Sequence, residues 1–251
     1  MHSIIERHTK IALQFSGGKD SLACLFLLRP YWDKLTVFWV NTSAVFPETL
    51  DIMNQVRAMV PHFIEIKSNA LEDVEYNGFP VDILPETRTG FGRLVDGHTK
   101  PVMRLSSICC ATNIWAPMLE AMKTFGATLI IRGQRVSETR KSPVKSGDVI
   151  DGVEYLFPIE SWSAESVRGF LGDRLPSHYR YTETSLDCWH CTAYLFENLG
   201  KWKYMREFHP EKLVHVRAKL FDLRSAVRRE SAIIDEVHEA MKEESVLCGV
   251  V

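Results

Sequence analysis

A short segment with two adjacent glycines and a lysine is the first candidate for chemistry in this sequence. Ser16-Gly17-Gly18-Lys19-Asp20-Ser21 directly follows an apolar run at residues 10–15, and the residues after it favour a helix. Glycines let backbone N–H groups approach an anion closely, and the start of a helix adds the positive end of its dipole. Lys19 can add a point charge, and the hydroxyls of Ser16 and Ser21 can bond phosphate oxygens. The segment therefore predicts a phosphate-binding loop; the alternative is an ordinary glycine-containing turn between a strand and a helix.

Two tight pairs of cysteines are the second candidate. Cys109 and Cys110 are adjacent, and Cys188-Trp189-His190-Cys191 has the Cys-x2-Cys spacing with which two thiolates reach one metal centre. Adjacent side chains on a helix point about 100° apart, which is awkward for one tetrahedral zinc ion. A four-iron cluster can hold neighbouring thiolates on different irons, so the four cysteines predict a [4Fe–4S] cluster. The alternatives are that Cys109 and Cys110 pack in the core, and that Cys188 and Cys191 are chance neighbours or half of a zinc site.

The composition limits the classes of protein that fit. The 251 residues suffice for one α/β domain with a small C-terminal extension. A net charge of −2 argues against a strongly basic nucleic-acid binder. The sequence contains no apolar run of membrane-spanning length, and its first residues lack the apolar core of a signal peptide. We therefore expect a cytoplasmic protein without a membrane partner, in which the six cysteines are poor candidates for structural disulfides.

Strand-like and helix-like segments alternate along the chain, which is typical of a parallel sheet covered by helices. Residues 68–106 show no clean periodicity, so we expect an irregular insertion over the site. Loops are expected at residues 140–153 and 177–191. The expected strands lie at residues 10–15, 35–40, 63–66, 128–131 and 155–157, the last at an edge of the sheet, and the expected helices at residues 20–28, 48–60, 109–125, 164–171 and 211–244.

This order of elements predicts the fold class and the domain organisation. We expect an α/β fold with a doubly wound, mostly parallel sheet and a helical C-terminal extension. Residues 1–195 would form the nucleotide-binding domain, and residues 196–251 a helical extension of the same unit. The sequence does not decide between a monomer and a homodimer.

Several segments together resemble a known family. Residues 16–21 resemble the PP-loop of the adenine nucleotide alpha-hydrolase-like superfamily, and the chain resembles the phosphoadenosine phosphosulfate (PAPS) reductase family within it. The iron–sulfur adenylyl-sulfate (APS) reductases of that family carry a Cys-Cys pair followed later by a Cys-x2-Cys pair, as this chain does. Three further segments resemble family motifs: Val40-Asn41-Thr42 with Phe46-Pro47-Glu48-Thr49, Gly133-Gln134-Arg135 with Ser137 and Arg140, and Phe157-Pro158-Ile159 with Trp162.

The resemblance implies which residues hold an adenine nucleotide and a [4Fe–4S] cluster. Arg135 and Arg140 carry planar guanidinium groups that can bind phosphate or sulfate oxygens in pairs; the alternative for both is a surface position. Arg104 is a candidate to face the substrate anion or the cluster, and His190 is expected to hydrogen-bond a neighbour rather than bind metal. The implied nucleotide-binding residues are Ser16, Gly17, Gly18, Lys19, Asp20, Ser21, Asn41, Thr42, Gly133, Arg135 and Arg140, and the implied cluster ligands are Cys109, Cys110, Cys188 and Cys191.

The first interpretation of the activity is a sulfonucleotide reductase. Cys248-Gly249 near the C-terminus resembles the family's catalytic segment, without its flanking acid and histidine. The Cys248 thiolate would attack the sulfur of APS or PAPS, and thioredoxin or glutaredoxin would then release sulfite. Lys19 and Arg135 would offset the charge of the sulfate and phosphate.

The second interpretation is an ATP pyrophosphatase, because the intact loop at residues 16–21 is what ATP-cleaving relatives keep and APS reductases tend to lose. Such an enzyme, with Mg²⁺, would adenylate a nucleic-acid acceptor for sulfur transfer, as in DNA phosphorothioation or RNA thiolation, with a cysteine desulfurase as sulfur donor. A second departure from the APS reductases lies after the cysteine pair, where those enzymes usually have a basic residue. The segment Ala111-Thr112-Asn113-Ile114-Trp115 supplies none. A non-catalytic nucleotide-binding regulator is the third alternative.

Overall fold

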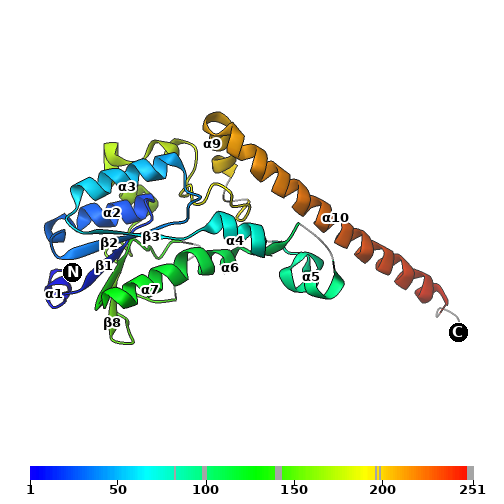
Figure 1. Ribbon diagram of the computed structural model, residues 1–251, viewed down its shortest axis with the longest axis horizontal. Helices are drawn as coiled ribbons and strands as arrows, with labels where there is room; N and C mark the ends of the chain where they lie inside the picture. Colours follow the sequence, from blue (N-terminus) through cyan, green and yellow to red (C-terminus); the bar gives the residue numbers. More distant parts are fainter. Residues whose placement is uncertain (82, 98–100, 139–142, 196, 198, 248–251) are drawn as a thin grey trace.

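The computed structural model describes residues 1–81, 83–97, 101–138, 143–195, 197 and 199–247. It consists of an α/β body from which one long helix projects (Figure 1). The helices and strands, in chain order, are α1 (His2–Glu6), β1 (Ile11–Gln14), α2 (Lys19–Leu27), β2 (Leu35–Asn41), α3 (Pro47–Met59), β3 (Phe63–Lys67), α4 (Ala70–Asn77), β4 (Phe79–Val81), α5 (Gly90–Asp96), β5 (Met103–Leu105), α6 (Ser106–Cys110), α7 (Ala116–Phe125), β6 (Leu129–Arg132), β7 (Val149–Ile150), β8 (Val153–Leu156), α8 (Ala164–Leu171), α9 (Leu199–Phe208) and α10 (Pro210–Leu247).

The central sheet has six strands among the described residues, in the order β3-β2-β1-β6-β8-β7. Its neighbouring strands pair in parallel except for β7, which pairs with β8 in the antiparallel direction. The expected mostly parallel sheet is therefore confirmed, and five of its strands lie where the sequence predicts them, with ends shifted by a few residues. Two expectations are wrong: β7 lies within residues 140–153, where the sequence predicts a loop, and β8 is not the edge strand, because β7 pairs along its outer side.

Helices cover both faces of this sheet. Successive residues of a strand point to opposite faces. Leu13 of β1 and Val37 of β2 therefore belong to one core, which also includes residues of α2, α3 and α8. Ala12 and Phe38, one residue away, pack on the opposite face with Met118 of α7. The expected doubly wound arrangement is confirmed by these two separate cores.

The segment expected to be irregular, residues 68–106, is more ordered than its sequence suggests. It contains α4, α5 and a second, two-stranded parallel sheet formed by β4 and β5. Phe79, Val81 and Met103 of that sheet pack against Leu223 and Ala226 of α10. The expectation failed because these strands are only three residues long, and the core that stabilises them comes from a helix far along the chain.

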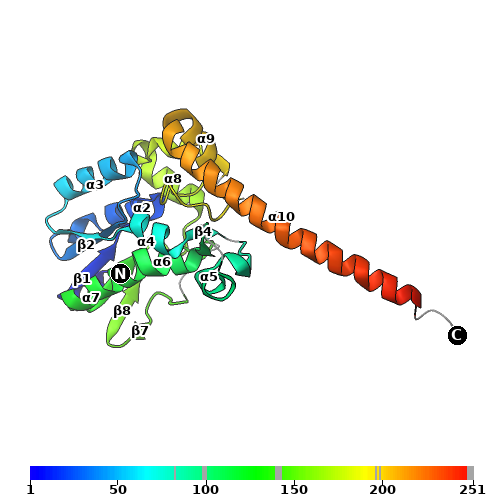
Figure 2. The same cartoon turned by 45° about the vertical axis from the view of Figure 1, so that its right-hand side comes forward.

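The C-terminal extension includes a single helix of 38 residues, α10, which leaves the body along a nearly straight path (Figures 1 and 2). Its first half packs on α9 and on the β4–β5 sheet. Every residue from Ser231 to Lys242 is exposed. In the part of the chain that the structure describes, no helix combines the length and the apolar character needed to cross a membrane.

Candidate nucleotide and cysteine site

The phosphate loop, residues 16–21, connects the end of β1 to the start of α2. Gly17 has a φ of +79°, and a Cβ atom there would lie 2.8 Å from Cε of Met53. The left-handed backbone therefore favours glycine at this position, whereas the flexible end of Met53 could move to accept a Cβ atom. The hydroxyl of Ser16 accepts a hydrogen bond from the N–H of Gly18 at 3.3 Å, and that of Ser21 donates to the Gly18 carbonyl at 2.9 Å. These bonds fix the shape of the loop at the positive end of the α2 dipole.

Asp20 joins the two cations of the site. Nζ of Lys19 lies 2.8 Å from one of its carboxylate oxygens, and Nε of Arg135 donates to the other at 2.7 Å. Both cationic side chains are largely buried. The structure therefore brings Lys19 and Arg135 together from different elements, as the sequence predicts. Arg140 lies outside the described residues.

Gly133 explains how Arg135 reaches the loop. A Cβ atom at Gly133 would lie 2.5 Å from the carbonyl oxygen of Asp20, so the chain that leaves β6 runs directly against the first turn of α2. Arg135 follows two residues later and also donates from Nη1 to the hydroxyl of Ser137 at 2.8 Å. Burial raises the pKa of the neighbouring Glu138 above its ordinary value. The role of Gly133 is thus one of close backbone packing.

Asn41 and Thr42, both expected at the nucleotide, have different surroundings. The Asn41 amide donates to Glu65 on β3 at 2.8 Å and accepts from the Ser43 N–H at 3.0 Å. Thr42 is buried, and its hydroxyl lies 3.4 Å from Sγ of Cys188. Thr42 therefore contacts the cysteine turn, residues 188–191, at the carboxyl end of β2.

A single segment connects the cysteine turn to the phosphate loop. The N–H of Lys19 donates to the Tyr179 hydroxyl at 2.8 Å, and a Cβ atom on Gly18 would lie 3.5 Å from Cβ of Ser185. Three residues after Ser185, Cys188 pairs with Val45 in an isolated antiparallel bridge. The segment from Tyr179 to Cys188 thus runs from one candidate site to the other.

Cys109 and Cys110 end α6, and a π-helical turn at Ala111–Trp115 follows them. Such turns inside helices occur frequently at functional sites. Sγ of Cys109 lies 3.2 Å from Nη2 of Arg104, which also pairs with Asp73. Of the two positions expected for Arg104, the structure thus places it beside a cysteine.

Burial and neighbouring thiols raise the pKa values of Cys110 and Cys188. Burial, and then the neighbouring Cys191 and Cys109, raise the pKa of the Cys110 thiol to about 12. Burial raises the pKa of the Cys188 thiol to about 12 as well, and Cys191 adds to that shift. The fold therefore brings together two cysteine pairs that are 78 residues apart between Cys110 and Cys188.

The donor set fits an iron–sulfur cluster in its chemistry. Four thiols come from two segments, and N–H and O–H groups of Arg104, Asn113 and Thr42 lie within hydrogen-bonding reach of sulfur. Hydrogen bonds to sulfur are one means by which proteins tune such clusters. Within the described ranges, no three side chains of His, Cys, Asp or Glu form a group that could hold a metal ion. A four-iron cluster binds each thiolate at a different iron, so its ligands are more widely spaced than those of one ion.

Sequence reasoning missed several polar groups near these sites. The His190 side chain is buried, and neither of its ring nitrogens has a hydrogen-bond partner among the described residues. The expectation that His190 hydrogen-bonds a neighbour is therefore wrong. Gln14 and Arg132 are paired neighbours at the ends of β1 and β6, and each has one buried side-chain nitrogen without a partner. Lys201 is fully buried beside Cys188. Only the tertiary structure identifies these residues, because no local motif marks them.

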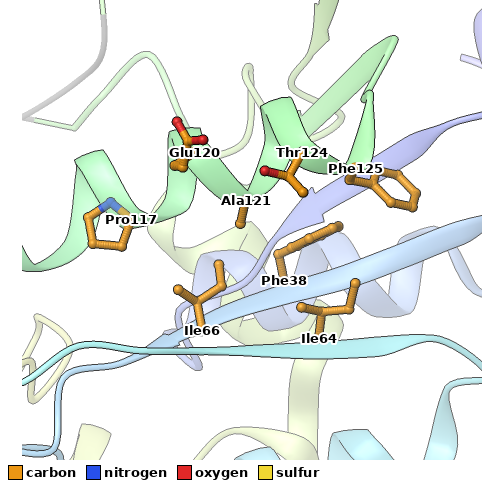
Figure 3. Close-up of a pocket in the computed structure, with 8 residues that line it drawn as sticks. All are labelled: Phe38, Ile64, Ile66, Pro117, Glu120, Ala121, Thr124 and Phe125. Atoms are coloured by element: carbon orange, nitrogen blue, oxygen red, sulfur yellow. The ribbon is translucent and has the colours of Figure 1, made fainter.

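Two cavities lie outside the phosphate loop. An apolar pocket of about 480 Å³ lies between α7 and the strands β2 and β3; Phe38, Ile66 and Phe125 contribute to its lining (Figure 3). It contains none of the predicted site residues. A second cavity of about 530 Å³ adjoins the cysteine turn at Trp189 and His190. The chemistry indicated by the sequence therefore lies away from the apolar pocket.

Comparisons with known proteins identify the family of the chain. The sequence model of the phosphoadenosine phosphosulfate reductase domain matches residues 10–194. A relative from Gloeobacter violaceus, named phosphoadenosine 5′-phosphosulfate reductase, is 24% identical over 204 residues, which cover 77% of this chain and 78% of the relative.

Two solved structures are more distantly similar. The phosphoadenylyl-sulfate reductase of Candida auris, solved as a phosphate complex, is 16% identical with a TM-score of 0.47, over 69% of this chain and 76% of that one. Yeast FAD synthetase in complex with FAD is 12% identical with a TM-score of 0.38, over 65% of this chain and 50% of that one.

Proposed function

The chain belongs to the phosphoadenosine phosphosulfate reductase domain family, and from this premise we propose that it reduces a sulfonucleotide, APS or PAPS, to sulfite. The observation that carries the proposal is the shared segment between the phosphate loop and the cysteine turn. Tyr179 of that segment bonds the N–H of Lys19, and Cys188 follows on the same segment. A nucleotide on the loop would therefore lie near the cysteines.

The chain's own residues can bind the anionic part of this substrate. The backbone of residues 16–21 and the start of α2 supply N–H donors and a positive dipole end. Lys19 and Arg135 offset the charge of phosphate and sulfate oxygens, and Asp20 holds both cations beside the loop. Gln14 and Arg132, whose buried nitrogens have no protein partner, lie at the same carboxyl edge of the sheet, where ligands bind in open α/β folds.

Cys248 is the proposed nucleophile. Its thiolate attacks the sulfur, a new S–S bond forms, and the bond from sulfur to the phosphate oxygen breaks, so that AMP or adenosine 3′,5′-bisphosphate leaves. A dithiol of thioredoxin or glutaredoxin then attacks the S-sulfocysteine, releases sulfite and is itself oxidised to a disulfide.

Cys248 lies outside the described residues. It follows Leu247, the last residue of α10, and α10 is about 57 Å long and points away from the body (Figure 2). A nucleophile attached there reaches a phosphate loop only when α10 bends or when the loop belongs to a second copy.

We further propose that Cys109, Cys110, Cys188 and Cys191 hold a [4Fe–4S] cluster. When bound, the cluster would tune the electrostatic field around the substrate, while the reducing electrons come from the dithiol. The proposal is supported by the polar groups of Arg104 and Thr42, which lie within hydrogen-bonding reach of the sulfurs of Cys109 and Cys188.

The second candidate is an ATP pyrophosphatase that adenylates a nucleic-acid acceptor for sulfur transfer. It is favoured by the intact phosphate loop, which hydrogen bonds hold together: the hydroxyls of Ser16 and Ser21 bond each other, Ser21 bonds the Gly18 carbonyl, and Lys19 bonds Asp20. Mg²⁺ and the loop would stabilise the departing pyrophosphate, and a cysteine desulfurase would supply sulfur.

Product analysis of anaerobically purified protein distinguishes the two activities. The protein is incubated with ATP, and separately with APS and PAPS plus thioredoxin, and pyrophosphate and sulfite are quantified. We expect sulfite from a sulfonucleotide, and its loss in Cys248→Ser but not in the core variant Cys24→Ala. Pyrophosphate and AMP from ATP, without sulfite, would overturn the reductase proposal in favour of the pyrophosphatase.

A further inference from the structure

Lys201 is buried in an unusual environment. It lies in the first turn of α9 with an exposed fraction of 0%. Its Nζ donates to the carbonyl of Cys188 at 2.7 Å and lies 5.3 Å from the ring centroid of Trp202. Gly200 permits this position, because a Cβ atom there would lie 2.1 Å from the carbonyl oxygen of Tyr181. The backbone is therefore shaped to place this lysine against the cysteine turn.

No carboxylate among the described residues forms an ion pair with Lys201. Other buried cations near the two sites do have such partners: Arg104 pairs with Asp73, and Arg135 pairs with Asp20. A buried ammonium group without a counter-charge is strongly unfavourable, since one carbonyl and aromatic faces replace little of its hydration. The buried ammonium group of Lys201 therefore calls for a negatively charged group other than a carboxylate of the described residues.

The groups that can supply this charge are the thiols beside it. The carbonyl of Cys188 accepts hydrogen bonds both from Nζ of Lys201 at 2.7 Å and from the N–H of Cys191 at 3.2 Å, so the ammonium group lies directly on the turn that carries these two thiols. The same cation acts on His190, which lies between them. As neutral thiols, these cysteines leave the ammonium uncompensated, whereas as metal-bound thiolates they provide the missing negative charge.

We infer that Lys201 is the counter-charge of a metal–thiolate centre on the cysteine turn, and that it acts as a positioning residue which stabilises the thiolates of Cys188 and Cys191. This inference rests on the cluster proposed above. Because a nearby cation favours the more negatively charged state, Lys201 raises the reduction potential of the centre.

The test compares Lys201→Met with Lys201→Arg and with Lys203→Met, a control at an exposed position of the same helix. Each protein is reconstituted anaerobically with iron and sulfide, folding is checked by circular dichroism, and iron per chain and the midpoint potential are measured. We expect folded Lys201→Met to lose at least half of its iron or to show a lower midpoint potential. Lys201→Arg and Lys203→Met should stay close to the unsubstituted protein.

Two results would contradict the inference, and they can be told apart. If folded Lys201→Met has the same iron content and midpoint potential as the unsubstituted protein, the role of Lys201 is overturned while the cluster proposal stands. If neither the unsubstituted protein nor Lys203→Met binds iron, the cluster proposal itself fails, and the inference fails with it.

A second measurement covers the case in which Lys201→Met does not fold alone. In the Cys188→Ser/Cys191→Ser background, no thiolate at these positions can compensate the ammonium. Adding Lys201→Met should therefore raise the thermal unfolding midpoint of that protein. A lower midpoint would show that Lys201 stabilises the fold by packing and by its hydrogen bond to the Cys188 carbonyl, and would overturn the inference.

Discussion

Arg135 donates from Nε to a carboxylate oxygen of Asp20 at 2.7 Å, which ties the segment after β6 to the first turn of α2. The other oxygen of Asp20 lies 2.8 Å from Nζ of Lys19. One carboxylate thus holds two cations beside the phosphate loop. This geometry makes the loop and the segment after β6 a single anion-binding unit.

Removal of the Arg135 guanidinium should weaken nucleotide binding, and it should also destabilise the fold because the ion pair with Asp20 is largely buried. Charge-assisted hydrogen bonds contribute about 1.5–3 kcal/mol, so Arg135→Gln should weaken adenine-nucleotide affinity by roughly 10- to 100-fold. Isothermal titration calorimetry measures the affinity. Arg228→Gln, at an exposed position of α10, is the control and should bind as the unsubstituted protein does. Equal affinities for Arg135→Gln and the control would exclude Arg135 from the binding site.

The close approach at Gly133 makes a prediction about stability. An added Cβ would lie 2.5 Å from the Asp20 carbonyl oxygen, so Gly133→Ala must displace the backbone of α2 and should lower the free energy of unfolding by about 1–3 kcal/mol. Gly169→Ala, inside α8 with open space around it, should instead raise that free energy by up to about 1 kcal/mol. Urea unfolding compares the two, and a neutral Gly133→Ala would contradict the packing argument.

Glu48 should make folding stability depend on pH. Burial favours its neutral form, but hydrogen bonds from Tyr204 and His209 outweigh burial and hold the pKa of Glu48 below its ordinary value of 4.5. A carboxyl whose pKa is lowered by folding stabilises the fold above its unfolded pKa, and this contribution is lost as the pH falls through the folded pKa.

The comparison of Glu48→Gln with the unsubstituted protein by urea unfolding from pH 7 to pH 3 tests this. The variant should be less stable at pH 7, and the difference should shrink below about pH 4.5. Glu120→Gln, at an exposed position of α7, provides the control. A difference that stays constant down to pH 3 would refute the assignment.

The four cysteines of the proposed cluster should behave as a set. Serine at any one of Cys109, Cys110, Cys188 or Cys191 should lower iron and acid-labile sulfide after anaerobic purification, because a cluster with three thiolates is less stable. Cys24→Ala, on the buried face of α2, should bind as much iron as the unsubstituted protein does, although the substitution should lower the free energy of unfolding. Iron that persists unchanged in all four serine variants would rule out this ligand set.

The distal half of α10 should contribute little to the fold of the body. All side chains from Ser231 to Lys242 are exposed. Truncation after Glu230 should therefore change the free energy of unfolding by no more than about 0.5 kcal/mol relative to the full-length chain. The same truncation removes Cys248 and should abolish sulfite formation. A truncated protein that unfolds far more easily would show that the distal helix is stabilised by contacts outside the single chain.

Local patterns in the amino-acid sequence predict much of the fold and the phosphate loop. The apolar run before Gly17 and Gly18, the alternation of strands with helices, and the paired cysteines are local patterns, and local patterns report strand, turn and helix directly. The family resemblance rests on those same segments, and the family match over residues 10–194 spans them. The structure accordingly places Lys19, Asp20 and Arg135 together, as expected.

The surroundings of these motifs follow from the tertiary structure and not from local sequence. It places Thr42 against Cys188, puts Arg104 beside Cys109, and builds the β4–β5 sheet on residues of α10. It also buries Lys201 without a carboxylate partner, a position that its sequence neighbours do not indicate. The physical reason is that burial and charge compensation depend on residues distant along the chain, whereas secondary structure and loop conformation depend mainly on neighbours in sequence.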